Sequence, residues 1–172
     1  MGVRCQTKDE VTNSVGLLIS ILVRYPEVAT INFEPDKQIL NFTFIIARPL
    51  EDAELTRLEN ILLDSIEVFN ELEGRDTGMV ALRYQAGDQL TLIEVQRDVD
   101  TLILEEISLI VDLFRQHLQP GLVTEIYEPL FEDDMLMQEE IIDHMLESVR
   151  EQVEEKYLYA FREEGRVLVF NK

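Results

Sequence analysis

The stretch 28–47, VATINFEPDKQILNFTFIIA, decides the fold class of this chain. Its two halves, Val28 to Phe33 and Gln38 to Ala47, are rich in β-branched and aromatic residues. Between them, the segment EPDK at 34–37 has the composition of a turn. The stretch therefore predicts a β-hairpin in which alternate side chains of each strand point into a core.

Helices are predicted on both sides of this hairpin. The segment from Asp9 to Arg24 is apolar over most of its circumference, which predicts a helix that is buried or lies at an interface, and Pro26 ends it. From Leu50 to Leu72, apolar residues recur at helical spacing, and Gly74 follows the end of that pattern. The order helix, hairpin, helix is thus established within the first half of the chain.

The hairpin and its following helix then recur. Strands are predicted over 79–84 and 89–95, and a helix over 99–118. At one constant separation, Ile31-Asn32-Phe33 corresponds to Leu82-Arg83-Tyr84, and Gln38-Ile39 corresponds to Gln89-Leu90. We interpret this as an internal ββα repeat. The alternative is that two unrelated segments have converged on the same pattern of apolar residues.

The last third of the chain adds a further helix and hairpin. A short strand is predicted over Leu122 to Tyr127, an acidic connection over 128–134, and a helix over Met135 to Val153. Two strands, Tyr157 to Phe161 and Val167 to Phe170, form the terminal hairpin.

These elements predict an α+β fold, in which repeated ββα units build a mostly antiparallel sheet with helices on one face. A second interpretation is open, because the order from the Gln38 strand to the Leu122 strand is β-α-β-β-α-β, as in a ferredoxin-like core. We expect residues 1–127 to form the α+β core, and residues 128–172, the acidic helix and terminal hairpin, to pack on the same domain.

Strand alternation predicts the direction of side chains in the sheet. The residues expected to point toward the helices are Ile31, Phe33, Phe42, Phe44, Leu82, Tyr84, Ile93 and Val95. Those expected on the opposite, polar face are Thr30, Asn32, Asn41, Thr43, Arg83 and Glu94.

The chain is strongly acidic. Its 172 residues include 15 Lys and Arg against 35 Asp and Glu, a formal net charge of −20, and much of the excess lies between Glu125 and Glu155. Such a charge repels the phosphates of nucleic acids and anionic membrane surfaces, so neither is an expected partner. A basic protein, a divalent cation or simple solubility are the uses of the charge that this argument leaves.

The chain has one cysteine, Cys5, which cannot form an intrachain disulfide. Its longest apolar stretch, 16–23, is shorter than a membrane span. We therefore expect a protein of the cytoplasm.

One cluster of residues has the chemistry of metal ligands. Glu140, Asp143, His144 and Glu147 lie on one face of the predicted fourth helix, opposite its apolar residues. Oxygen donors with one imidazole suit a divalent cation, so these four residues are our candidate metal ligands. The alternative is the solvated polar face that any amphipathic helix of so acidic a chain would present. No other cofactor is predicted.

A second candidate lies in the terminal hairpin. Arg162 and Arg166 flank its acidic turn, and two guanidinium groups together can hold a carboxylate or phosphate. The alternative is a solvated turn with cross-strand ion pairs.

No motif in the sequence identifies a chemistry. The leading hypothesis is a non-enzymatic interaction or regulatory protein that forms a homodimer, with the first helix and the terminal hairpin as candidate surfaces. The second hypothesis is a divalent-metal-dependent enzyme, such as a hydrolase, acting through Glu140 to Glu147. The third is that the acidic surface imitates nucleic acid and captures a basic protein.

Overall fold

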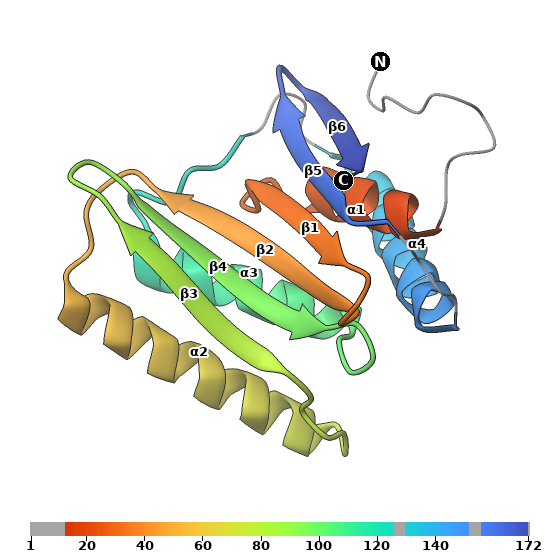
Figure 1. The fold of residues 1–172 in the computed structure, drawn as a ribbon, viewed down its shortest axis with the longest axis horizontal. Helices are drawn as coiled ribbons and strands as arrows, with labels where there is room; N and C mark the ends of the chain where they lie inside the picture. The colour runs from red at the N-terminus through yellow and green to blue at the C-terminus, as the bar shows by residue number, and fades with distance from the viewer. Residues whose placement is uncertain (1–12, 126–129, 152–155, 172) are drawn as a thin grey trace.

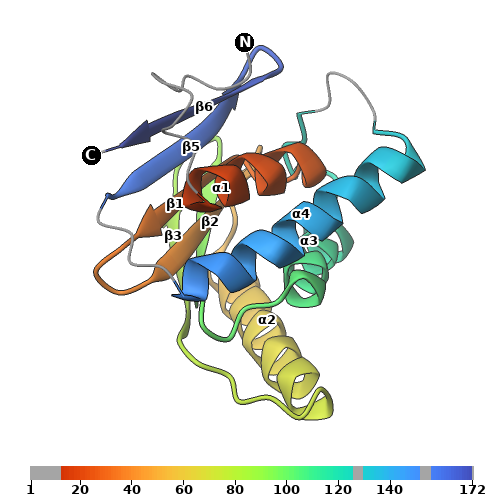
Figure 2. The same cartoon turned by 90° about the vertical axis from the view of Figure 1, so that its right-hand side faces the viewer.

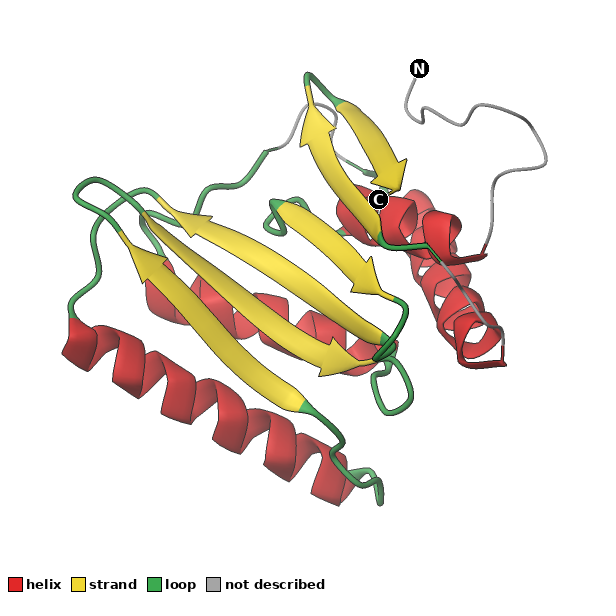
Figure 3. Ribbon diagram, in the orientation of Figure 1, coloured by secondary structure: helices red, strands yellow, loops and turns green. Residues whose placement is uncertain are grey.

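The computed structural model describes residues 13–125, 130–151 and 156–171. These residues form an α+β fold, as predicted, with helices and an antiparallel sheet (Figures 1 and 3). The helices are α1 (Asn13–Arg24), α2 (Asp52–Leu72), α3 (Leu104–Leu118) and α4 (Glu132–Glu151). The strands are β1 (Thr30–Glu34), β2 (Ile39–Ile46), β3 (Val80–Ala86), β4 (Thr91–Asp98), β5 (Leu158–Glu163) and β6 (Arg166–Asn171).

The strands form one sheet in the order β3-β4-β2-β1-β5-β6, and every neighbouring pair is antiparallel. Sequence neighbours form the three hairpins, whereas β2 pairs with β4 and β1 pairs with β5 over long separations in the chain. The terminal hairpin thus extends the sheet formed by the first half of the chain, with Ile31 opposite Ala160.

The helices lie on one side of the sheet in two layers. Figures 1 and 2 show α1, α2 and α3 next to the sheet, and α4 on the far side of α1. Helix α1 packs on β1, β5 and β6, while α4 packs chiefly on α1 and also on α3. Because α1 lies between the sheet and α4, its apolar residues Leu17, Leu18, Ile21 and Leu22 are buried within the chain. Of the two alternatives for this helix, burial is therefore the one observed.

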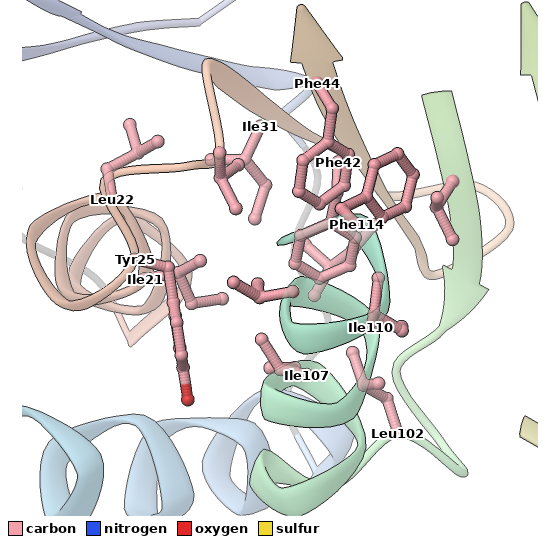
Figure 4. Packing of buried hydrophobic residues seen from close by; sticks show 14 of the residues in the cluster. Ile21, Leu22, Tyr25, Ile31, Phe42, Phe44, Leu102, Ile107, Ile110 and Phe114 are labelled. Atoms are coloured by element: carbon pink, nitrogen blue, oxygen red, sulfur yellow. The ribbon is translucent and has the colours of Figure 1, made fainter. Parts of the chain in front are cut away.

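The core lies between the sheet and the first layer of helices (Figure 4). At its centre, the rings of Phe44 on β2 and Phe114 on α3 are stacked, with their centroids 3.8 Å apart. Ile21 and Tyr25 approach the same region from α1 and its C-terminal end. Apolar residues of strands and helices that are distant in sequence thus form one continuous core.

Some boundaries differ from the prediction. The third helix begins at Leu104 rather than at Val99, because Val99 continues the chain out of β4 and donates its N–H to the carbonyl of Gln38. Within residues 122–125, the expected strand is reduced to an isolated bridge between Leu122 and Ile46. This bridge uses the end of β2 beyond the point where β1 stops pairing. The remainder of the expected strand, residues 126–127, lies outside the described residues.

The strand order agrees with either interpretation of the topology. The order β3-β4-β2 is compatible with two adjacent ββα units and is also the order of three strands in a ferredoxin-like core. In the latter, the isolated bridge at Leu122 would occupy the place of the last strand. Both interpretations remain predictions.

The predicted directions of side chains hold for most of the sheet, with two differences in burial. Tyr84, expected in the core, is 45% exposed, because it lies near the end of the edge strand β3, which has a neighbour on one side. Asn41, expected on the exposed face, is 1% exposed. Its amide donates hydrogen bonds to Asn32 (2.5 Å) and Glu34 (2.8 Å), so neighbouring polar side chains enclose it.

Candidate functional site

Aromatic side chains gather on the face of the terminal hairpin that is turned away from the helices. In β5, Leu158 and Ala160 are buried, whereas Tyr159, between them, is 39% exposed. Its cross-strand partner Phe170 is 51% exposed. Phe161 contacts both rings, at centroid distances of 5.7 Å from Tyr159 and 5.7 Å from Phe170. The hairpin therefore presents a connected aromatic surface to solvent.

This aromatic cluster, Tyr159, Phe161 and Phe170, borders a sheet edge. Strand β6 pairs with β5 on one side, and the described residues place no strand on its other side. Between Arg166 and Asn171, the strand has the apolar sequence VLVF, without a charged residue that would oppose pairing with another strand. An edge of this composition is suited to adding a strand from another chain.

The same face of the sheet is polar over β1, β2, β4 and β3. Arg83 and Glu94 form an ion pair across β3 and β4, and Asn41 binds Asn32 and Glu34. Tyr157, just before β5, has a phenol whose pKa is raised by partial burial and by the nearby Glu34 and Glu94 carboxylates. The outer face thus changes from polar to aromatic as it approaches β6.

The candidate metal ligands lie where the sequence placed them, on a single face of α4. Glu140, Asp143, His144 and Glu147 are all exposed, and the apolar residues Ile142, Leu146 and Val149 of the opposite face are buried. In the described part of the chain, no three His, Cys, Asp or Glu residues are arranged to hold a metal ion. The metal site stays a prediction.

The two arginines of the terminal hairpin point to opposite faces. Arg162 is paired with Val167, and Arg166 with Glu163, so the strand alternation separates the two side chains. Arg166 is exposed. Arg162 lies on the inner face, where it donates to the carbonyl oxygens of Leu22, Tyr25 and Val28. Arg162 therefore binds the C-terminal end of α1, and the two guanidinium groups do not form a pair.

A groove of about 900 Å³ lies beside Arg162. It is formed by the C-terminal end of α1, the residues after it, the end of α3, the start of α4 and the β5–β6 turn. Apolar side chains such as Leu22, Val23 and Met135 line it together with charged ones. At its edge, Phe131 is 79% exposed, just before α4 begins. We refer to this feature as the α1–α4 groove.

Comparisons with protein families, curated proteins and solved structures found no match for this chain. In the described part of the chain, no helix is both long enough and apolar enough to cross a membrane.

Sequence reasoning missed the α1–α4 groove and a buried ion pair. The residues of the groove come from several separate segments, so no local pattern connects them. The buried pair, Arg97 with Glu106, had a detectable signal: Arg97 follows Ile93 and Val95 at the alternation of inward positions on β4. An arginine at such a position needs a buried partner.

Proposed function

We propose that this chain is a non-enzymatic interaction module that forms a homodimer through the terminal hairpin. The observation that supports this proposal is the aromatic cluster of Tyr159, Phe161 and Phe170 next to the apolar edge strand β6. Aromatic residues are enriched in interfaces, because they bury a large apolar area at a small cost in side-chain entropy.

The geometry suits a two-fold symmetric contact. Two copies of β6 can pair antiparallel about a two-fold axis, because each strand then meets its own equivalent. With the axis perpendicular to the sheet and centred on Leu168, Phe170 of each copy is opposite Arg166 of the other. That arrangement keeps both aromatic clusters on one face of a continuous sheet and adds a cation–π contact at each end.

The test is the oligomeric state measured by size-exclusion chromatography with light scattering, over a series of protein concentrations. The wild-type chain is expected to be a dimer at micromolar concentration. Phe170→Ala is expected to weaken the dimer about 30-fold, since truncation of an aromatic side chain buried in an interface costs about 2 kcal/mol. Phe170 is half exposed in one chain, so the substitution should leave the fold intact.

A matched control is Tyr84→Ala. Tyr84 has a similar exposure but lies on β3, the edge strand at the other end of the sheet. This variant should dimerise like the wild type. A wild-type monomer at 100 μM, or a dimer that Phe170→Ala leaves as stable as the wild type, would show that the proposal is wrong.

A further inference from the structure

The α1–α4 groove has a second property that the homodimer does not use. Three arginines line it, Arg24, Arg115 and Arg162, and each is bound to groups of the chain itself. Arg24 pairs with Glu139 (2.7 Å) and stacks on the Tyr25 ring, and Arg162 donates to backbone carbonyls. Their positive charges are therefore already engaged.

Arg115 is also bound to groups of the chain, and its partner Glu27 is buried. It donates to Glu27 at 2.7 Å and to Asp112 at 2.8 Å. Glu27 is 6% exposed, and its second carboxylate oxygen, Oε1, is buried with no hydrogen-bond partner among the described residues. A buried acceptor without a donor is energetically unfavourable, so the groove has capacity for one more donor once its side chains adjust.

The remaining charge at the groove is negative. Asp134, in the first turn of α4, and Glu164, in the β5–β6 turn, line it and are exposed. Within the described part of the chain, neither of them makes an ion pair or a side-chain hydrogen bond. Glu132 and Asp133 lie next to Phe131 and are also exposed. An apolar groove with engaged arginines and unengaged carboxylates is complementary to a cationic ligand.

We propose that the α1–α4 groove binds a basic, amphipathic segment of a protein partner, with an apolar side chain beside Val23, Phe131 and Met135 and with Lys or Arg beside Asp134 and Glu164. Charge complementarity selects this occupant. An anionic ligand would have to displace Glu139 from Arg24, Glu27 from Arg115 or Glu125 from Arg162, and an uncharged one would leave the carboxylates of Asp134 and Glu164 unmatched. The volume lies within the range of protein ligand sites.

The probe for the test is a fluorescein-labelled peptide with a Leu-Phe-Leu centre and two Lys residues on each side. Binding is measured by fluorescence anisotropy on the full chain. We expect affinity in the micromolar range at low salt and weaker binding at 0.15 M salt, where the screening length falls to about 8 Å. A peptide with Glu in place of Lys should not bind, and one with Ser in place of the apolar centre should bind at least about tenfold more weakly, since each lost apolar contact lowers affinity several-fold.

Two charge-reversed double variants locate the binding. The double variant Asp134→Lys with Glu164→Lys should bind the peptide about tenfold more weakly, since each exposed charge pair changes the affinity a few-fold. Asp133→Lys with Glu163→Lys makes the same change in net charge, in the same helix turn and the same hairpin, at exposed residues that do not line the groove. This control should lose much less affinity.

Phe131→Ser tests the apolar contact in the same way, with Leu136→Ser on the exposed side of α4 as its control. Equal losses in groove and control variants would mean that only the overall negative charge attracts the peptide, and would overturn the proposal. Absence of binding at low salt would overturn it as well. The oligomeric state is measured separately, so failure here leaves the homodimer proposal unaffected, and the reverse also holds.

Discussion

The buried ion pair between β4 and α3 allows a quantitative test of what holds the sheet to its helices. Arg97 and Glu106 are both 0% exposed. The guanidinium donates to both carboxylate oxygens of Glu106. The distance from Nη2 to Oε1 is 2.7 Å, and Nε donates to Oε2. Asn70 of α2 donates to the same carboxylate at 2.9 Å. The pair therefore links β4, α2 and α3 in the interior.

The perturbation is Glu106→Gln, which keeps the shape of the side chain and removes its charge. Arg97 would then remain buried, with Asp98 at 2.5 Å and the neutral oxygens of Met79 and Thr101 at 3.1 and 3.0 Å. Removing one partner of a buried pair costs about 3–5 kcal/mol, because the other charge is left in the interior. Since Asp98 still compensates part of the Arg97 charge, we expect the free energy of unfolding to fall by the lower end of this range, about 3 kcal/mol.

The assay is urea unfolding followed by far-UV circular dichroism, which suits a chain without tryptophan. With a slope of about 2 kcal/mol per molar urea, the midpoint should fall by about 1.5 M. Arg97→Met should cost at least as much, because it leaves the Glu106 carboxylate buried without its cation. The double variant Arg97→Met with Glu106→Leu should cost clearly less than the sum of the single changes, because no isolated charge remains.

The control is Arg83→Met on the neighbouring strand. Arg83 also pairs with a glutamate, Glu94, but its side chain is 65% exposed. Exposed pairs contribute about 1 kcal/mol or less. If Glu106→Gln destabilises no more than Arg83→Met does, burial is not what makes the first pair important, and the reasoning is wrong.

Two further predictions concern α1. Burial raises the pKa of the Tyr25 phenol, which shares a 2.6 Å hydrogen bond with Ser108. The folded state therefore favours the neutral phenol: this contribution to stability is complete below pH 10 and is lost as the pH rises through the raised pKa. Tyr25→Phe should cost about 1 kcal/mol at pH 8, and urea midpoints should show the gap to wild type narrowing by pH 11; a constant gap would contradict this. At Gly16, a Cβ atom would lie 2.6 Å from Met145 Sδ, so Gly16→Val should cost about 1–3 kcal/mol by overpacking α1 against α4. Thermal unfolding should show that Met145→Ala reduces this cost, and a cost unchanged in that background would place the strain elsewhere.

The success of sequence reasoning for the strands and helices has a local cause. The pattern of apolar residues in 28–47 shows which side chains are buried on folding. The same side chains are buried whichever helix packs against the strands. For this reason Ile31, Phe42 and Phe44 could be assigned to the core before their neighbours were known. The ends of elements depend on single contacts, as at Val99, where the backbone N–H donates to the carbonyl of Gln38 and the chain leaves β4 before α3 begins.

The candidate sites show the limit of the same reasoning. The helical spacing of Glu140, Asp143, His144 and Glu147 could be read from the sequence, but whether a second element faces them depends on packing. Arg162 and Arg166 appeared as a pair because they flank one turn, and only the strand register separates their side chains onto opposite faces.

The α+β class, the hairpins and the amphipathic helices can be predicted from the sequence, because they depend on side-chain patterns within about 20 residues. The pairing of β5 with β1, the packing of α4 on α1 and the meeting of distant segments at the α1–α4 groove are visible in the folded chain alone. These arrangements depend on which apolar surfaces and hydrogen-bonding edges meet across the whole chain. The charge of −20 illustrates the difference, since the composition gives its size, whereas packing places the exposed carboxylates of Asp134 and Glu164 beside the α1–α4 groove.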